Sequence, residues 1–328
     1  PGLTGTCGET NSRDCLPVDE LRWRRALNQL NVGSQVGLFH DLALTFGWHY
    51  IFADDLSFRY ANGVTAQNST VDPQTGDPRD TLFSHDFKSR LKGAGSFDLG
   101  LKFGALNDER DESKPSWVLY VNWSTPWTAE TYRPDQQRAT LDEPGPVGDG
   151  VHRITFGTSL SKRVANLGLI GIDSNVHRRG YIDPYMDFSY TLPIPQRGKA
   201  DPSLVHNKQN NPFGAPPSHE ARFNAGFEVV PYEDYKAMRK VALDIGLRAQ
   251  FNSEGRNYSI LSSPLGELTF EEQHLYVGGM FGIYAQAAEF LRIKTGFGFG
   301  YTTEHFVTNE DVGDDKNGDK QVLLPDDD

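Results

Sequence analysis

Large and small side chains alternate in the stretch KTGFGFGYTTEHF, residues 294–306. Successive side chains of an extended chain point to opposite faces, so one face of this stretch is large and mostly aromatic and the other is nearly bare. The large face comprises Thr295, Phe297, Phe299 and Tyr301, and the bare face comprises Gly296, Gly298 and Gly300. We therefore expect a β-strand whose two faces meet very different surroundings.

The same period of two runs through most of the chain and predicts an all-β protein. Apolar residues fall at alternate positions within the segments 96–104, 117–123, 153–161, 183–192, 221–229 and 240–251, most of which are 9–12 residues long. A tilted strand of roughly 9–11 residues crosses a hydrocarbon core, and these segments are close to that length. We interpret 36–46 as a further strand, and 48–60 and 167–173 as separate strands or parts of their neighbours. The predicted fold is an antiparallel transmembrane β-barrel of about ten strands, with a range of roughly 8–12.

Connections of two lengths join these segments. Long polar connections cover roughly 61–92, 125–150, 195–218 and 253–271, and shorter ones cover 107–116, 231–238 and 287–290. Outer-membrane barrels show this asymmetry, with short turns on one side of the membrane and long loops on the other.

Two arrangements fit the alternation. In a soluble β-sandwich or barrel that binds carbohydrate or another ligand, the apolar face is buried and the polar face meets water. In a membrane barrel, the apolar face meets lipid and the polar face lines the interior. Glycine recurs on the polar face, where it is costly unless the backbone curves or other side chains need the space. We favour the membrane barrel and expect its interior to carry a charge network of mixed sign, made of Asp98, Lys102, Arg153, Asp187, Arg222, Glu228, Asp244, Arg248, Arg292 and Lys294.

Two further features point to the bacterial outer membrane. Aromatic residues near segment ends suit the girdle that marks a membrane interface, and they are Trp117, Trp123, Tyr190 and Tyr301. The spacing of Lys294, Gly296, Phe299 and Tyr301 resembles the β-signal of Gram-negative outer-membrane β-barrel proteins, which the barrel-assembly machinery reads. The resemblance implies a small porin-like or structural barrel. Residues 302–328 follow this strand, so either the tail extends beyond the barrel or a closing strand lies after 306.

The two ends of the chain differ from the middle. Cys7 and Cys15 are close enough in sequence to form a local disulfide in an oxidising compartment. Residues 17–31 predict a short helix, because Pro17 suits a first helical turn and an apolar stripe follows. We therefore expect an N-terminal segment at 1–34, a barrel at 35–306 and an acidic flexible tail at 307–328.

The acidic tail leaves two interpretations open. Asp315, Asn317 and Asp319 match part of a calcium-loop pattern, but the first and last ligands of a full loop are missing. The segment is therefore either a disordered acidic tail or a weak calcium site. No other cofactor is expected.

Composition excludes several classes of protein. The net charge is −12, from 44 acidic and 32 basic residues, and a nucleic-acid-binding protein needs a basic footprint instead. No segment reaches the roughly 20 apolar residues of a membrane-spanning helix. The chain starts at Pro1 without an apolar signal segment, so we expect a mature, processed product. We find no catalytic motif and expect no enzymatic activity.

The expected function is that of a structural or interaction component of the cell envelope. Its long loops and termini would dock envelope proteins, and the outer-membrane bilayer would surround it. A barrel of eight to ten strands is filled by its own side chains, whereas a wider one leaves a channel. A narrow porin-like channel for ions or small solutes is therefore one alternative, and the soluble ligand-binding protein is the other.

Overall fold

A computed structural model describes residues 21–65, 86–108, 110–111, 113–134, 136, 139–165, 178–204, 215–234, 236–305 and 307–308. Two predictions fall outside these residues, namely the disulfide between Cys7 and Cys15 and the calcium ligands Asp315, Asn317 and Asp319. The possible strand at 167–173 also lies outside them.

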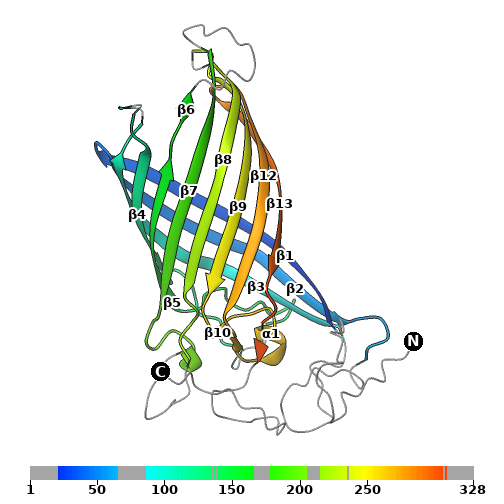
Figure 1. The fold of residues 1–328 in the computed structure, drawn as a ribbon. Helices are drawn as coiled ribbons and strands as arrows, with labels where there is room; N and C mark the ends of the chain where they lie inside the picture. Colours follow the sequence, from blue (N-terminus) through cyan, green and yellow to red (C-terminus); the bar gives the residue numbers. More distant parts are fainter. Residues whose placement is uncertain are drawn as a thin grey trace, which may run out of the picture.

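One large antiparallel sheet dominates the structure, as the alternation predicted (Figure 1). Ten strands follow one another in chain order: β1 (Leu21–Phe39), β2 (Leu42–Tyr60), β3 (Phe87–Leu106), β4 (Ser116–Thr125), β5 (Val151–Ser161), β7 (Arg178–Pro195), β8 (Glu220–Asp234), β9 (Arg239–Asn252), β12 (His274–Ala288) and β13 (Leu291–Thr302). The short β6 (Val164–Ala165) pairs with β7 off this path. The sheet curls into a half-barrel, which confirms an all-β fold with about ten antiparallel strands.

The sheet has two free edges. Strand β1 pairs only with β2, and β13 pairs only with β12, within the residues that the structure describes. Both edge strands are exposed along nearly their whole length. The curled sheet is therefore open between its first and last strands.

The predicted helix at 17–31 is wrong for residues 21–31, which begin β1. Leu30 and Val32 alternate with Asn31 and Gly33, so the period-two pattern already starts within the predicted helix. Strand β2 supplies backbone partners along the whole of β1, and such pairing overrides a weak helical preference. The barrel sheet thus begins at 21 rather than at 35.

The prediction of a single strand over 36–46 is also wrong. A tight turn at His40 and Asp41 separates β1 from β2, and Phe39 faces Leu42 across it. His40 adopts a φ of 35°, in the left-handed region that tight hairpin turns require. The apolar residues on both sides of the turn share one face of the sheet, so the alternation conceals the turn.

The large apolar side chains of the sheet lie on its exposed outer face. Those with the greatest exposed fractions include Leu247 at 66%, Phe297 at 68%, Phe299 at 67% and Tyr301 at 63%. A soluble sheet normally buries such a face against a second layer. Here the outer face has no second layer among the described residues.

The connections after β2, β4, β7 and β9 leave one end of the sheet, which we call the long-loop end. The short turns after β1, β8 and β12 leave the other, which also carries the sixteen-residue connection 162–177 between β5 and β7 (Figure 1). At the long-loop end, β10 (Gly255–Asn257), β11 (Thr269–Glu271) and β14 (Val307–Thr308) form a small separate sheet. Helix α1 (Ser262–Leu265) and the 3₁₀ turn η1 (Pro202–Leu204) lie at the same end. We call the described parts of 126–150, 196–219 and 253–273, together with β14, the cap. Because Val307 and Thr308 belong to it, the predicted flexible tail does not begin at 307.

Small apolar clusters hold the cap in place. Val151, Ala200, Leu204 and Leu268 are buried together with Tyr258 against them. A second cluster surrounds Phe58, where Ile260, Leu261 and Leu265 of the cap pack against β2 and its neighbours. Backbone hydrogen bonds also join Gly145 of the cap to Arg90 and Lys92 of β3. The cap is therefore a folded layer attached to β1 to β3 and to β5 of the curled sheet.

Candidate functional site

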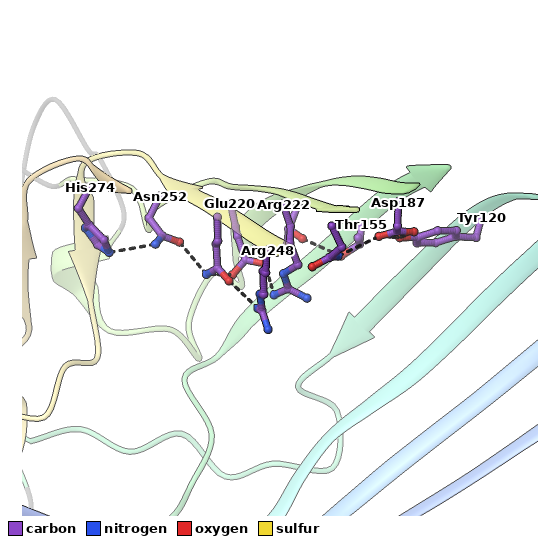
Figure 2. Close-up of polar contacts among 11 residues, drawn as sticks. Tyr120, Thr155, Asp187, Glu220, Arg222, Arg248, Asn252 and His274 are labelled. Carbon is purple, nitrogen blue, oxygen red and sulfur yellow. Dashed lines mark hydrogen bonds and ion pairs between the residues drawn. The ribbon is translucent and has the colours of Figure 1, made fainter. Parts of the chain in front are cut away.

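Polar side chains occupy the inner face of the sheet, which is the candidate functional site. Strand pairing places Asn224 of β8 opposite Arg248 of β9 and opposite Asp187 of β7. Their sequence neighbours Ala225 and Leu247 lie on the outer face, because side chains alternate along each strand. The alternation alone thus brings polar residues of six strands, β4 to β12, onto one surface (Figure 2).

Asp187 is the centre of one group of contacts on this surface. Tyr120 Oη donates to its carboxylate at 3.1 Å, and Ser159 Oγ donates at 2.5 Å. Asn224 Nδ2 donates to the same carboxylate at 3.3 Å. Donors from β4, β5 and β8 therefore fix the orientation of one carboxylate on β7.

Glu220 is the centre of a second group. Its carboxylate forms an ion pair with Arg222 and accepts a hydrogen bond from Gln250 Nε2 at 2.8 Å. Gln250 Oε1 accepts from Arg248 Nη2 at 2.7 Å, and Gln250 Nε2 donates to Asn252 at 3.2 Å. Asn252 then contacts His274 Nε2 at 2.9 Å. This chain of contacts runs from β8 across β9 to the start of β12 (Figure 2).

Smaller pairs complete the inner face. Arg153 pairs with Asp149, and Glu228 pairs with Lys240. Asp244 accepts a hydrogen bond from Tyr185 Oη at 2.7 Å. A bidentate pair also joins Arg25 to Asp54 on this face nearer the cap. The bidentate pair of Arg90 with Asp55 is one residue along each strand and therefore lies on the opposite, outer face.

The interior charges predicted from sequence lie on this face, with two degrees of pairing. Arg153, Asp187, Arg222, Glu228, Asp244 and Arg248 all have polar partners, as described above. Asp98 and Lys102 of β3 are half-buried on the same face, where Asp98 packs across from Gly47. Arg292 and Lys294 share the face by register with β12 but are exposed at the free edge of β13. The network is therefore densest over β4 to β9 and absent from the open edge among the described residues.

Aromatic rings cover several inner-face glycines. The ring of Tyr120 lies over Gly157 on the adjacent strand, and that of Tyr276 lies over Gly300 of β13. Tyr185 covers both Gly226 and Gly246. Gly157, Gly226, Gly246 and Gly300 thus leave room for tyrosine side chains from neighbouring strands.

A cavity of about 690 Å³ lies between this network and the cap. Its wall includes Tyr120, Asp187 and Arg222 of the sheet, and its other side includes Arg256 and Tyr258 of the cap. Arg256 is only 2% exposed and donates from Nη1 to the Leu268 carbonyl at 3.2 Å. Tyr258 Oη donates to the Tyr132 carbonyl at 2.7 Å. The side chains around the cavity are therefore held in place before any ligand enters.

Several residues of the site are not among the interior residues predicted from the sequence, namely Glu220, Asn252 and His274, whereas Gln250 lies on the polar face that the alternation of 240–251 predicts. Glu220 and Asn252 continue the period-two alternation of β8 and β9 by one more position on the inner face. The alternation could therefore have predicted both residues. Asp149, Arg256 and Tyr258 belong to the cap, where no period predicts which side chains face the sheet.

The β-signal-like residues all lie on β13. Lys294 and Gly296 face inward, while Phe299 and Tyr301 lie on the exposed outer face. Of the predicted girdle residues, Trp123 and Tyr190 lie toward the cap end of their strands, and Trp117 lies at the opposite end of β4. Their positions fit two aromatic levels on the outer surface.

Comparison with known proteins adds no relative. The chain matches none of the protein-family models, and a search of curated proteins finds no significant match. Within the described residues, three or more His, Cys, Asp or Glu side chains nowhere converge as metal ligands would. The helices that the structure describes are too short to cross a bilayer.

Proposed function

We propose that this protein is a bacterial outer-membrane β-barrel, acting as a non-catalytic structural and interaction component of the cell envelope. One observation carries the proposal: large apolar side chains are exposed on the outer face of successive strands, while charged side chains pair on the inner face. A lipid environment stabilises this arrangement, because lipid solvates the apolar outer face while the paired charges remain in the interior.

The cap favours an interaction role rather than an open channel. It is folded, it packs against β1 to β3 and against β5, and it covers the inner face at the long-loop end. Exposed Trp127 and Leu141 on its surface offer apolar contacts to an envelope partner. Long loops face the cell exterior in barrels of this kind, so the partner would bind from that side.

Spin labels on two adjacent residues test the membrane placement. Leu247 is on the outer face and Arg248 is on the inner face, so labels at Leu247→Cys and Arg248→Cys sample opposite sides of β9. Cys7 and Cys15 are first replaced by serine. In lipid vesicles, we expect the label at 247 to be relaxed by oxygen, which concentrates in lipid, and the label at 248 to resist it. Equal access of a water-soluble nickel reagent to both labels, or a monomer stable in buffer without detergent, would contradict the proposal.

Conductance across planar bilayers separates the capped barrel from a pore. We expect no single-channel steps from the inserted protein, because the cap occupies one end of the interior. Current steps of uniform size, whose frequency rises with protein concentration, would support the porin-like channel instead of the interaction role.

A further inference from the structure

The cavity beneath the cap has the chemistry of a ligand site. Its volume of about 690 Å³ falls within the range of roughly 300–1,000 Å³ that small-molecule sites occupy. Nine elements contribute to it, namely β4, β5, β7, β8, β9 and β12 of the sheet and η1, β10 and β11 of the cap. A cavity shared by a wall and a folded cap can enclose a ligand on opposite sides.

Hydrogen-bonding groups make up most of the cavity lining. Hydroxyl groups come from Tyr120, Thr155 and Tyr258, among others, and side-chain amides come from Asn122 and Asn224. Apolar lining is confined to a few residues such as Val151 and Leu204. An apolar ligand would leave these polar groups without partners, and each buried polar group left unpaired weakens binding. The lining therefore selects a hydrophilic ligand.

The charges of the lining nearly cancel. Three guanidinium groups, of Arg153, Arg222 and Arg256, face four carboxylates, of Asp149, Asp187, Glu220 and Glu271. Most of these charges are already engaged with one another, as in the pair of Arg222 with Glu220. An anionic ligand, such as a phosphate or a carboxylate, would face four negative charges in the lining. A cationic ligand would face three positive charges. Charge balance therefore favours a ligand without net charge.

The guanidinium of Arg222 is only partly engaged at the cavity. It donates to Glu220 through Nη2, and the side chain as a whole is still 36% exposed. The side chain is held by its ion pair and lines the cavity. Asn224 lies two residues along β8 and is held by Asp187. A hydroxylated ligand can accept from both side chains at little cost in ordering, because both are already positioned.

We propose that this cavity binds a small neutral polyhydroxylated molecule, a mono- or disaccharide. Planar polar side chains supply paired hydrogen bonds to its hydroxyls, and the rings of Tyr120 and Tyr258 supply flat surfaces for its C–H faces. The binding site lies inside the sheet, whereas the proposed envelope role uses the outer face and the surface of the cap.

Calorimetric titration of the purified full chain tests the site. The protein is held in an amine-oxide detergent, because detergents with sugar headgroups would compete. Maltose, sucrose and lactose serve as neutral probes, and glucose 6-phosphate serves as the anionic probe. We expect at least one neutral sugar to bind with a Kd of about 1 mM or tighter, and glucose 6-phosphate to bind at least tenfold more weakly.

Two variants locate the binding. Arg222→Gln removes the guanidinium and Asn224→Leu removes the amide at similar volume, and each should weaken sugar binding at least tenfold. Lys294→Gln, on the inner face of β13 away from the cavity, is the matched control and should bind like the parent. Retained heat-modifiable gel migration shows that each variant is folded.

Three outcomes would overturn the assignment. They are no binding of any neutral probe, preferential binding of glucose 6-phosphate, and undiminished sugar binding by folded Arg222→Gln and Asn224→Leu. These results do not depend on placement in a membrane. A failed spin-label experiment with intact sugar binding would instead contradict the proposed function alone.

Discussion

Tyr185 on β7 reaches across β8 to donate a hydrogen bond to Asp244 on β9, with 2.7 Å between Oη and Oδ1. The strand between them carries Gly226 opposite Tyr185, and Gly246 lies next to it on β9. A Cβ built on either glycine would meet the Tyr185 hydroxyl at less than 3 Å. Three strands are thus joined by one side chain that passes over two glycines.

Replacing Gly226 with alanine should break this link. The added methyl also meets the Ile245 backbone carbonyl, which cannot move as a side chain can. We expect a loss of about 1–3 kcal/mol in unfolding free energy, from a displaced tyrosine and a half-buried carboxylate that loses its donor. Urea unfolding followed by tryptophan fluorescence in detergent measures it.

Gly37 provides the matched control for Gly226. It lies on β1, and a Cβ built there meets nothing within 4 Å. Gly37→Ala should leave the unfolding midpoint unchanged. An equal loss in both variants would mean that strand glycine in general, rather than the Tyr185 link, sets the stability.

Two bidentate ion pairs near the cap should differ in energetic value. Asp54, paired with Arg25, has a side chain only 8% exposed, whereas Asp55 and Arg90 are both 36% exposed. Arg25→Ala leaves a buried carboxylate without its cation, so we expect a loss of about 3–5 kcal/mol. Arg90→Ala should cost at most about 1 kcal/mol. Thermal unfolding of both variants in one detergent compares them, and equal costs would contradict the burial argument.

A cation on the outer face should oppose membrane insertion. Leu247 is 66% exposed on the outer face of β9, and an arginine at the bilayer midplane costs about 2–4 kcal/mol. We expect Leu247→Arg to reduce folding into vesicles, measured by heat-modifiable gel migration. Phe290 is 91% exposed in the turn between β12 and β13, so Phe290→Arg should fold normally. Equal folding of both variants would argue that the outer face does not meet lipid.

The turn between β3 and β4 should titrate at unusually low pH. Hydrogen bonds from Ser113, together with Lys114 at 3.1 Å, lower the pKa of Asp111 to about 2. Because the folded pKa is lower than the unfolded value of about 3.9, the carboxylate stabilises the turn at higher pH. That stabilisation is lost as pH falls from about 4 through 2. Carbon-13 chemical shifts of the Asp111 carboxyl should show the low midpoint, and Ser113→Ala should raise it.

Residues on the regular strands were largely predictable from the sequence. Period-two alternation placed Phe227 outward and Arg222 and Glu228 inward, because a strand fixes the face of each residue once its register is set. The same alternation failed at His40, where a two-residue turn leaves apolar residues on one face on both sides. The interpretation also failed at 21–31, where a few apolar residues at helical spacing belong to the first part of the long strand β1.

The cap and its contacts could not be predicted in the same way. Its segments are short and irregular, so which side chains of 126–150 or 253–273 face inward depends on packing around Leu204, Leu268 and Phe58. The contacts of Arg256 and Tyr258 follow from that packing. The residue types of these segments do not predict that packing, so the cavity could be identified only from the structure.

The two free strands, β1 and β13, have a consequence for assembly. Strand β1 starts at the capped end and β13 ends there, so the two strands run antiparallel. Their free edges can therefore pair with each other through backbone hydrogen bonds, and we call this pairing the seam. Lipid cannot solvate unpaired backbone groups, at several kcal/mol for each, so both edges need strand partners in a bilayer. A seam between the first and last strands joins residues far apart in sequence, which makes it the slowest contact to form. The pairing between β1 and β13 would also be the first strand pairing to break when the barrel opens.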